Sequence, residues 1–526
     1  MKLAVAILLF IAVTVVFFYP VFSDFSSSIA AFSSTDEPYG VIWSFWWSKF
    51  AFLNKINQDF INVIAYPFGI VQNAVIFFPL WGLIAKYLAI IFNEVFAYNA
   101  ILMSSYVLAA LSMFALVFYL SRSWAVSVFS GLIYSFCPFH LVRTWQHFGT
   151  AQIQWMPLYL LLLFKLRDRQ NLKLAFLLGI VFALNYYFDV HYAYFMAIMT
   201  LFFLIFMLPN AKSRVNFVKF LLIGLGVGAL LVIPAFLPFL KRILNGAEVV
   251  SARSLVRPFE DLFSQSARPL SYLLPFTEQP IFGNFTKMFV GSKIWGESLT
   301  EHNVFLGFIP VALACFSFVK RRTLVVLMKA RGIDAGFALK FFFWFVLASW
   351  LFSQPPWWNF FGLKIYMPSF FLYKALPMFR AYVRFSILVT LGISVLAGFG
   401  LLLITDRLRA RRVFSLAAVI FLAIFTLFEF WPVPSEHTIN LSSYNKVYDW
   451  LRSQEGDFAI AEYPLDIDGP NETYKFYQTK HQKKIINGTL PGTYAHTVSK
   501  SLVRLSNRET LQNLRWMGVK FILVHP

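Results

Sequence analysis

The sequence predicts an all-α polytopic membrane protein that carries a small α/β domain at its C-terminal end. Of its 526 residues, 59% are hydrophobic and 13% are charged, whereas a soluble domain usually carries about 25% charged residues. The apolar residues gather in runs long enough to cross a bilayer, and the composition becomes water-soluble only after residue 431. We therefore expect a multi-spanning membrane domain over residues 1–431 and a soluble extracytoplasmic domain over residues 432–526.

Charge and aromatic content fit a membrane better than a nucleic-acid ligand. The net charge is +20, but Lys and Arg occur in short clusters between apolar runs, where they orient spans in an anionic membrane. The 64 Phe, 23 Tyr and 15 Trp suit a lipid-facing surface with ring belts at both interfaces. Membrane lipid is therefore an expected partner, and nucleic acid is not.

The first apolar run extends from Leu3 to Tyr19 and follows Lys2. A signal peptide begins in a similar way, but this run is long enough to span and lacks a small-x-small cleavage site. It predicts a retained first helix with a cytoplasmic N-terminus.

The basic clusters determine the predicted topology of the later spans. Placing every cluster in the cytoplasm of a cell membrane gives about eleven spans in total. The later spans are residues 99–120, 124–139, 153–166, 174–190, 192–208, 219–240, 303–319, 341–353, 384–404 and 413–431. Residues 21–98, 241–302 and 354–383 and the tail from residue 432 then lie outside.

Residues 75–93 form one apolar segment too many for this arrangement. If they crossed, every later basic cluster would lie outside. Pro79, Gly82 and Lys86 fit an interfacial or re-entrant helix. The alternative is a true second span with inverted topology downstream.

The tail alternates short strands with helices. Residues 458–465, 483–488 and 520–526 predict strands, and residues 442–453, 470–480 and 507–517 predict helices. This alternation predicts the small α/β domain. Acceptor binding, cavity lid and spacer are the roles left open for it.

The first outer loop carries two adjacent carboxylates, Asp36 and Glu37, just above the membrane surface and before an aromatic helix. A carboxylate at this level can act as a general base toward a hydroxyl acceptor or bind a cation. The structural alternative is that Asp36 caps the helix, with Pro38 in its first turn.

The order of these features resembles the GT-C superfamily of membrane glycosyltransferases, in which lipid-phosphate-linked sugars are donors. The chain is more closely similar to a set of poorly characterised bacterial and archaeal GT-C-like membrane proteins. The stretches that carry the resemblance extend over nearly the whole chain: Glu37–Trp43 with Trp47, Ala65–Pro67, Phe136–His140, Gln152–Pro157, Phe305–Pro310, Arg380–Phe385 and Asn487–Gly488.

The resemblance implies that an acidic residue of the first loop is the catalytic base. It would activate the acceptor for attack on the anomeric carbon of the sugar while the lipid phosphate leaves. Asp36 aligns with the Asp-Glu of protein O-mannosyltransferase-like loops, whereas Glu37 has the spacing to Trp43 and Trp47 that the closer relatives show for their Asp. Both stay candidates, with Asp36 slightly ahead.

A departing lipid phosphate needs cations at the outer interface. Arg380 and Arg384 are four residues apart, so at the helical start of the next span they would present adjacent guanidinium groups. These two are the candidates for donor-phosphate binding, and Lys86 is a weaker one. The alternative is ordinary interfacial anchoring.

Polar side chains at the outer turns predict a pocket for the sugar or the acceptor, because polar groups near lipid usually face a bundle interior or a wet cavity. For two of them, Glu301 and His302, capping of the next span is the alternative. The candidates are His140, Arg143, His147, Gln152, Gln154, Asp189, His191, Glu301 and His302.

Motifs for other chemistries are missing. No metal-ligand motif is present, so no metal site is predicted, although a divalent cation is left open. There is no phosphate-cradling glycine loop and no nucleotide fold, which disfavours a cytoplasmic nucleotide-sugar donor and ATP-driven transport.

These features predict a glycosyltransferase that moves a hexosyl or pentosyl group from a polyprenyl-phosphate carrier to a lipid, glycan or protein acceptor on the outer face of the membrane. The alternative is a non-enzymatic transporter or flippase, or an assembly scaffold, for lipid-linked surface saccharides. The lack of a clear internal repeat weighs against transport. Convergence of Asp36, Arg380 and Arg384 on one outward cavity would favour transfer.

Overall fold

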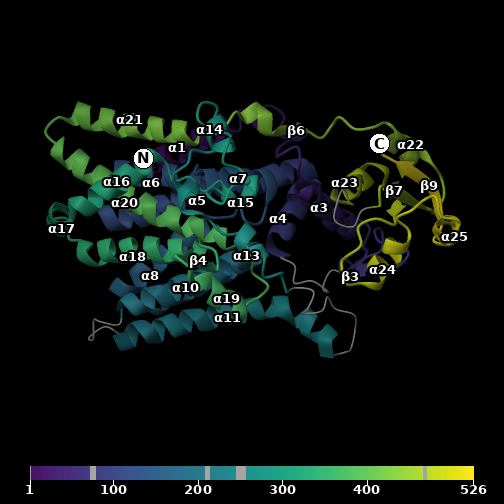
Figure 1. The fold of residues 1–526 in the computed structure, drawn as a ribbon, viewed down its shortest axis with the longest axis horizontal. Helices are drawn as coiled ribbons and strands as arrows, with labels where there is room; N and C mark the ends of the chain where they lie inside the picture. Colours follow the sequence, from purple (N-terminus) through teal and green to yellow (C-terminus); the bar gives the residue numbers. More distant parts are fainter. Residues whose placement is uncertain (1, 72–78, 208–213, 245–255, 466–470, 526) are drawn as a thin grey trace.

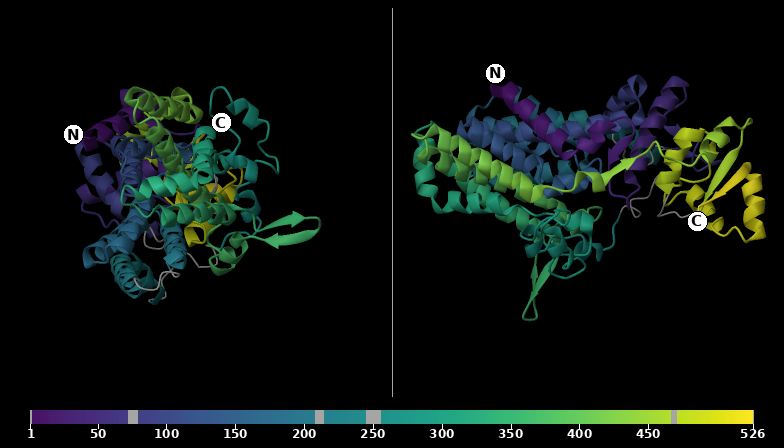
Figure 2. Two further views of the ribbon diagram at one scale, coloured as in Figure 1. Left: turned by 90° about the vertical axis from the view of Figure 1, so that its left-hand side faces the viewer. Right: turned by 90° about the horizontal axis from the view of Figure 1, so that it is seen from above.

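A computed structural model describes residues 2–71, 79–207, 214–244, 256–465 and 471–525. The molecule is elongated (Figure 1). A bundle of long helices forms one end, and the C-terminal strands and helices form the other end. Figure 2 shows the same separation from above.

Within these residues, six helices are long and apolar enough to cross a membrane on their own. They are α5 (Glu94–Ser121), α10 (Val190–Met207), α11 (Arg214–Leu244), α18 (Ala335–Ser353), α20 (Ser386–Arg407) and α21 (Arg412–Phe430). A seventh span results if α6 (Trp124–Ser135) and α7 (Pro138–Gln146), which meet at a bend of 43°, form one broken span. Pro138 at the start of α7 has no amide donor for a continuous helix, which explains the break.

The predicted spans all coincide with helices. The shorter ones are α1 (Lys2–Phe17), α8 (Trp155–Asp168), α9 (Leu172–Phe188) and α16 (Phe308–Val319). The polytopic, mainly helical character is confirmed, while the count of eleven spans stays a prediction.

Helix α20 forms the centre of the bundle. Of its most apolar window 89% is buried, against 11% for α21, which therefore lies at the periphery of the bundle. Glycines let α20 approach its neighbours closely. A Cβ on Gly400 would lie 2.2 Å from the carbonyl oxygen of Leu313 in α16, and one on Gly398 would lie 2.4 Å from Ser130 Oγ in α6.

The surplus apolar segment contains α4 (Pro79–Ile91), a helix of 13 residues that packs on α3 (Glu37–Leu53) and α5. Its length of about 20 Å is short for a hydrocarbon core of about 30 Å. The length favours a helix that does not cross, and this stays a prediction. Residues 72–78 of the segment lie outside the described residues.

The tail contains a parallel sheet in the order β8-β7-β9, formed by β7 (Ala459–Tyr463), β8 (Lys484–Ile485) and β9 (Val519–Val524). Its helices are α22 (Val447–Ser453), α23 (Asn471–His481), α24 (Tyr494–Ser501) and α25 (Arg508–Trp516). The predicted strands and helices are confirmed. Helix α24 was not predicted, because eight mostly polar residues give too short a periodic signal.

The tail docks on the first outer loop and on α3. Strand β1 (Ser28–Ala30) pairs with β6 (Thr438–Asn440), and Trp43 Nε1 donates to Gln478 Oε1 of α23 at 2.8 Å. Trp43, Trp46 and Trp47 share an apolar cluster with buried residues of the tail. The tail therefore packs against the end of the molecule that carries β1 and α3, and the domain boundary at 431/432 stays a proposal.

Short elements complete the outer segments and the connections. A hairpin of β4 (Trp357–Phe360) and β5 (Leu363–Tyr366) projects from the bundle in Figure 2. The others are α2 (Tyr19–Ser23), β2 (Phe60–Ile61), β3 (Ile70–Val71), α13 (Asp261–Ser264), η3 (Pro269–Tyr272), α14 (Gly283–Lys287), α15 (Leu299–His302), α17 (Arg321–Lys329), α19 (Pro368–Ala375), η4 (Tyr382–Phe385) and η5 (Pro434–His437).

Candidate functional site

A cavity of about 510 Å³ lies where the first outer loop, the turn between α9 and α10 and the tail helix α23 meet. Its ionisable lining consists of Asp36, Glu37, Asp189, Glu472 and Lys475. Most of the other lining side chains are apolar, among them Ile61, Ile64, Trp81, Phe148 and Phe188. Apolar walls with a few polar groups are typical of a site for a small molecule or for part of a larger one.

Asp36 occupies the N-cap position of α3, but its side chain makes no capping hydrogen bond. The Asp36 side chain therefore does not cap α3, which was the structural alternative for this residue. Partial burial raises the pKa of Asp36 above its ordinary value, the neighbouring Glu472 raises it further, and Lys475 opposes the change. A carboxylate with a raised pKa is a stronger acceptor of protons, as a general base requires.

Glu37 belongs to a different set of contacts. Its Oε2 lies 2.6 Å from Nδ1 of His147, and Nε2 of the same ring lies 3.7 Å from Glu301 Oε1. His147 therefore connects the first outer loop to the second large one. Both of its nitrogens face carboxylates, which orients the ring and fixes the direction of Glu37.

Glu301 is the centre of a buried charge group. Its Oε2 accepts from Arg143 Nη2 at 2.6 Å, and its Oε1 accepts from Arg384 Nη2 at 2.8 Å. Burial opposes the charged carboxylate, but the two guanidinium groups outweigh it and hold the pKa of Glu301 well below its ordinary value. The group Arg143–Glu301–Arg384 contains two guanidinium groups and one carboxylate, so its net charge is +1.

Asp189 lines the cavity from the turn between α9 and α10. Its Oδ1 accepts from the backbone nitrogen of His191 at 2.7 Å and lies 3.1 Å from the ring nitrogen Nδ1. Burial works against its charge, but His191 and Arg384 lower its pKa below the ordinary value. Asp189 is therefore held ionised and is a poorer proton acceptor than Asp36.

The prediction that Arg380 and Arg384 present adjacent guanidinium groups is wrong. Residues 376–381 are not helical, and a 3₁₀ turn at Tyr382–Phe385 precedes α20, so four residues do not make one helical turn here. Arg380 Nη1 binds Asp261 Oδ2 at 2.6 Å. Each guanidinium thus pairs with a different carboxylate, and only Arg384 belongs to the network around His147.

Several predicted residues do not line the cavity. The Lys86 ammonium lies 4.6 Å and 4.8 Å from the ring centroids of Phe52 and Tyr87, a cation–π arrangement between α3 and α4. His140 is buried against Tyr106, and His302 is buried against Gly296. The nitrogens of these two rings bind backbone carbonyls or a serine, and Gln154 donates to Gln152 in the interior. The two histidines and Lys86 therefore take part in packing contacts and do not line the cavity.

Glu472 and Lys475 of the tail were not predicted. They form an ion pair of 2.5 Å at the cavity, and the Lys475 ammonium lies 5.2 Å from the Trp43 ring centroid. The one local signal is Gly40, because a Cβ there would lie 1.7 Å from Glu472 Oε2. Nothing in the spacing of the sequence indicates that α23 covers the first turn of α3.

Replacing Gly40 by Ala is expected to displace the Glu472 side chain from its place beside α3 and to loosen α23 only slightly, because the added methyl overlaps the flexible end of Glu472 and no backbone atom of α23. Hydrogen exchange of residues 471–481 should accelerate by about twofold to fivefold, which corresponds to about 0.4–1 kcal/mol of lost local stability, the usual effect of disturbing one partly exposed ion pair.

Gly82→Ala in α4 is the matched control, since no atom lies within 4 Å of its added Cβ. The double variant Gly40→Ala, Glu472→Ala should return exchange toward the native rate. An unchanged exchange rate in Gly40→Ala would contradict the close packing of Glu472 against Gly40.

Among the described residues, no group of three or more His, Cys, Asp or Glu side chains is arranged to hold a metal ion.

Solved structures with a similar fold are membrane glycosyltransferases of the GT-C superfamily. The oligosaccharyltransferase of Archaeoglobus fulgidus in the apo form superposes with a TM-score of 0.60 at 12% identity, over 99% of this chain and 69% of its own. The AglB oligosaccharyltransferase of the same organism, in complex with an inhibitory peptide and a dolichol-phosphate, gives a TM-score of 0.58 at 12% identity over 99% and 69%.

The arabinofuranosyltransferase AftD from Mycobacteria gives a TM-score of 0.55 at 13% identity, over 99% of this chain but only 35% of its own. No family model matches the sequence, and no curated protein matches it either. The likeness therefore shows the GT-C fold, which confirms the fold that the sequence resemblance implied.

Proposed function

We propose that this chain, with its GT-C fold, is a membrane glycosyltransferase that moves a sugar from a polyprenyl-phosphate-linked donor to a lipid, glycan or protein acceptor at the cavity beneath α23. The observation that carries the proposal is Asp36, a half-buried carboxylate with a raised pKa and no capping hydrogen bond to α3, facing a largely apolar cavity. The dolichol-phosphate and peptide named for the AglB complex give further support for donor and acceptor classes.

In the proposed reaction Asp36 accepts the proton of the acceptor group. The acceptor atom then forms a bond to the anomeric carbon as the bond from that carbon to the phosphate oxygen breaks, and the electron pair leaves with the lipid phosphate. No enzyme nucleophile takes part. A direct displacement needs a correctly placed base and a stabilised leaving group.

Arg384 stays the candidate for stabilising the departing phosphate. It belongs to the charge group with one positive charge in excess, and Glu301 and His147 connect it to Glu37 at the cavity wall. Arg143 holds the other oxygen of Glu301 and acts as a positioning residue. Arg380, which pairs with Asp261, and Lys86, which lies over the Phe52 ring, are not included in the proposed phosphate-binding group.

The orientation belongs to the same proposal. The cavity would lie on the extracytoplasmic side of the cell membrane, together with the tail, and the N-terminus would be cytoplasmic. Eleven spans with a non-crossing α4 satisfy this orientation, because the basic clusters then all lie inside.

The test is to incubate the purified full chain with a panel of polyprenyl-phosphate sugars and candidate acceptors and to measure release of the carrier phosphate. Release that depends on one donor and one acceptor class supports the proposal. Thermal unfolding measurements first establish that the purified protein is folded. If this folded protein releases no carrier phosphate with any donor, the proposal is contradicted.

The pH dependence of transfer should identify the base. Transfer requires ionised Asp36, so its rate should fall as the pH drops through a pKa above the ordinary value of 3.8. Glu472 raises this pKa, so Glu472→Gln should move the acid limb of the rate profile to lower pH. Lys475 lowers it, so Lys475→Met should move the limb to higher pH.

The matched control is Glu455→Gln, an exposed carboxylate of the tail outside the cavity. An acid limb that does not respond to Glu472→Gln or Lys475→Met would show that Asp36 is not the titrating base.

A further inference from the structure

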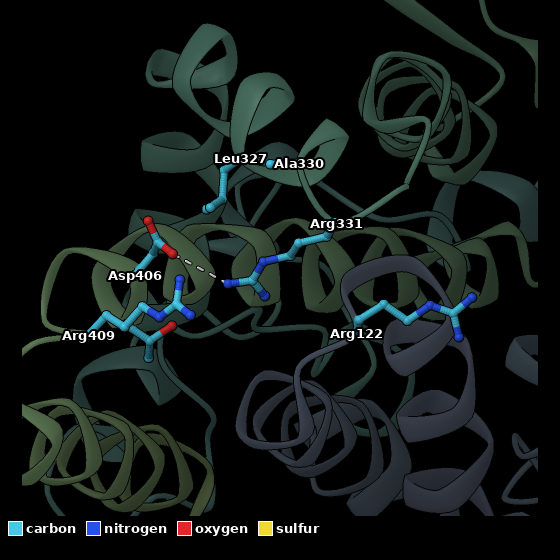
Figure 3. Close-up of a pocket in the computed structure, with 7 residues that line it drawn as sticks. Arg122, Leu327, Ala330, Arg331, Asp406 and Arg409 are labelled. Atoms are coloured by element: carbon cyan, nitrogen blue, oxygen red, sulfur yellow. Dashed lines mark hydrogen bonds and ion pairs between the residues drawn. The ribbon is translucent and has the colours of Figure 1, made fainter.

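A second cavity, of about 500 Å³, lies at the other end of the bundle (Figure 3). Three arginines from three separate turns line it: Arg122 after α5, Arg331 after α17 and Arg409 after α20. Asp406 is the one carboxylate in its lining. The cavity wall therefore carries two positive charges in excess, unlike the outer cavity, whose ionisable lining is mainly acidic.

The helices that reach this cavity start near the outer site. Helix α5 begins at Glu94, which pairs with Lys49 of α3, and α20 follows Arg384 of the outer charge group. The 28 residues of α5 extend about 42 Å, which exceeds a hydrocarbon core of about 30 Å. The two cavities thus lie on opposite faces of the membrane domain.

The arginine side chains are arranged rather than scattered. Arg331 Nη1 donates to the carbonyl oxygen of Ser121 at 3.3 Å, and Arg331 Nη2 pairs with Asp406 at 3.4 Å. Figure 3 shows Arg331 and Arg409 on two sides of Asp406, while the guanidinium group of Arg122 points away from these three side chains. Asp406 thereby orients Arg331 but leaves the cavity short of negative charge.

The cavity also adjoins an apolar surface. Leu327 and Ala330 of the α17 segment line it, and Leu324 and Met328 anchor α17 in the protein while Val326 is 71% exposed. The apolar side of α17 is thus buried, and Val326 is an exposed apolar side chain between the basic ends of the helix. Helices that expose apolar and basic side chains together bind to membrane interfaces. A ligand in the cavity can therefore place a charged group among the arginines and an apolar group on α17.

We propose that this cavity binds the phosphate group of an anionic ligand, with Arg331 and Arg409 as the primary ligands, Arg122 at the rim and α17 as the contact for an acyl chain. Guanidinium groups bind phosphate oxygens with two parallel hydrogen bonds and carry their charge at every physiological pH. The same phosphate chemistry occurs in an anionic lipid headgroup and in free phosphate. The adjoining apolar surface of α17 favours the lipid.

Native mass spectrometry of the full chain, purified with equal amounts of phosphatidylglycerol and phosphatidylcholine, tests the site. Arg409→Ala should lower phosphatidylglycerol binding by about fivefold, the effect of one basic residue at a membrane surface. The matched control is Arg411→Ala, since Arg411 is also exposed, lies two residues away and does not line the cavity. It should leave binding at this site unchanged.

Arg331→Lys keeps the charge and removes the bidentate geometry, so it provides a second variant that also lowers binding. Inorganic phosphate in lipid-free detergent separates the two sources. Thermal stabilisation by phosphate that Arg409→Ala removes supports a soluble ligand, and stabilisation by phosphatidylglycerol alone supports a headgroup. Equal losses in Arg409→Ala and Arg411→Ala, or no preference for phosphatidylglycerol, would overturn the site.

Discussion

Sugar transfer is expected to fall by about 10²–10⁴-fold when Asp36 is replaced by Asn, because this is the usual contribution of a positioned general base. The amide has nearly the same shape and cannot accept the acceptor's proton. The measurement is carrier-phosphate release by the purified chain with its best donor and acceptor. Binding of the donor should change far less than the rate, because Asp36 contacts the reacting proton.

The control is Asp59→Asn, an exposed carboxylate of the same outer loop that does not line the cavity. Glu37→Gln separates the two candidate bases, since Glu37 accepts from His147. A larger loss in Glu37→Gln than in Asp36→Asn would transfer the role of base to Glu37. Undiminished transfer after replacing both would refute the catalytic assignment to this loop.

Replacing Glu301 by Gln is expected to destabilise the protein by about 3–5 kcal/mol, the usual effect of removing one partner from a buried ion group. The amide keeps the shape but leaves the guanidinium groups of Arg143 and Arg384 without a compensating charge. Arg143 is fully buried, so water cannot replace the carboxylate. Chemical unfolding of the detergent-solubilised chain measures the loss.

Glu436→Gln, on an exposed carboxylate, is the control and should change stability by less than about 0.5 kcal/mol. The double variant Glu301→Gln, Arg143→Met should recover part of the loss, because it removes one of the two uncompensated charges. A Glu301→Gln protein as stable as the native chain would show that the charge group contributes little to folding.

These two experiments separate chemistry from architecture. Asp36 is half-buried, makes no capping hydrogen bond and lines the cavity, so its replacement should affect rate more than stability. Glu301 is buried and binds two arginines, so its replacement should affect stability first. A variant of Glu301 that folds and still loses transfer would assign a role in positioning Arg384.

The contacts of the tail narrow the three roles that its composition left open. Its helix α23 supplies Glu472 and Lys475 to the cavity, and the absence of a side chain at Gly40 makes room for it. This contact favours a role as a cavity lid or as part of an acceptor site. It argues against a role as a spacer. The pH profiles of the Glu472 and Lys475 variants test that role directly.

The features that depend on local patterns could be predicted from the order of the residues. Apolar runs predicted the helices of the bundle, because a chain that crosses lipid needs apolar side chains and must satisfy its backbone hydrogen bonds within the segment, as a helix does. Strand and helix periodicity predicted the sheet of the tail, and the acidic first loop predicted the residues at the cavity wall. Each of these signals lies within a few turns of chain.

Which charged side chains pair with one another depends on the packing of the folded chain. Arg380 and Arg384 are neighbours in sequence, yet they bind Asp261 and Glu301, because the backbone before α20 is not helical. Gly40 and Glu472 are remote in sequence, yet they touch. Spacing predicts contacts only within one regular element, whereas contacts between elements depend on how buried surfaces pack, which the order of residues alone does not reveal.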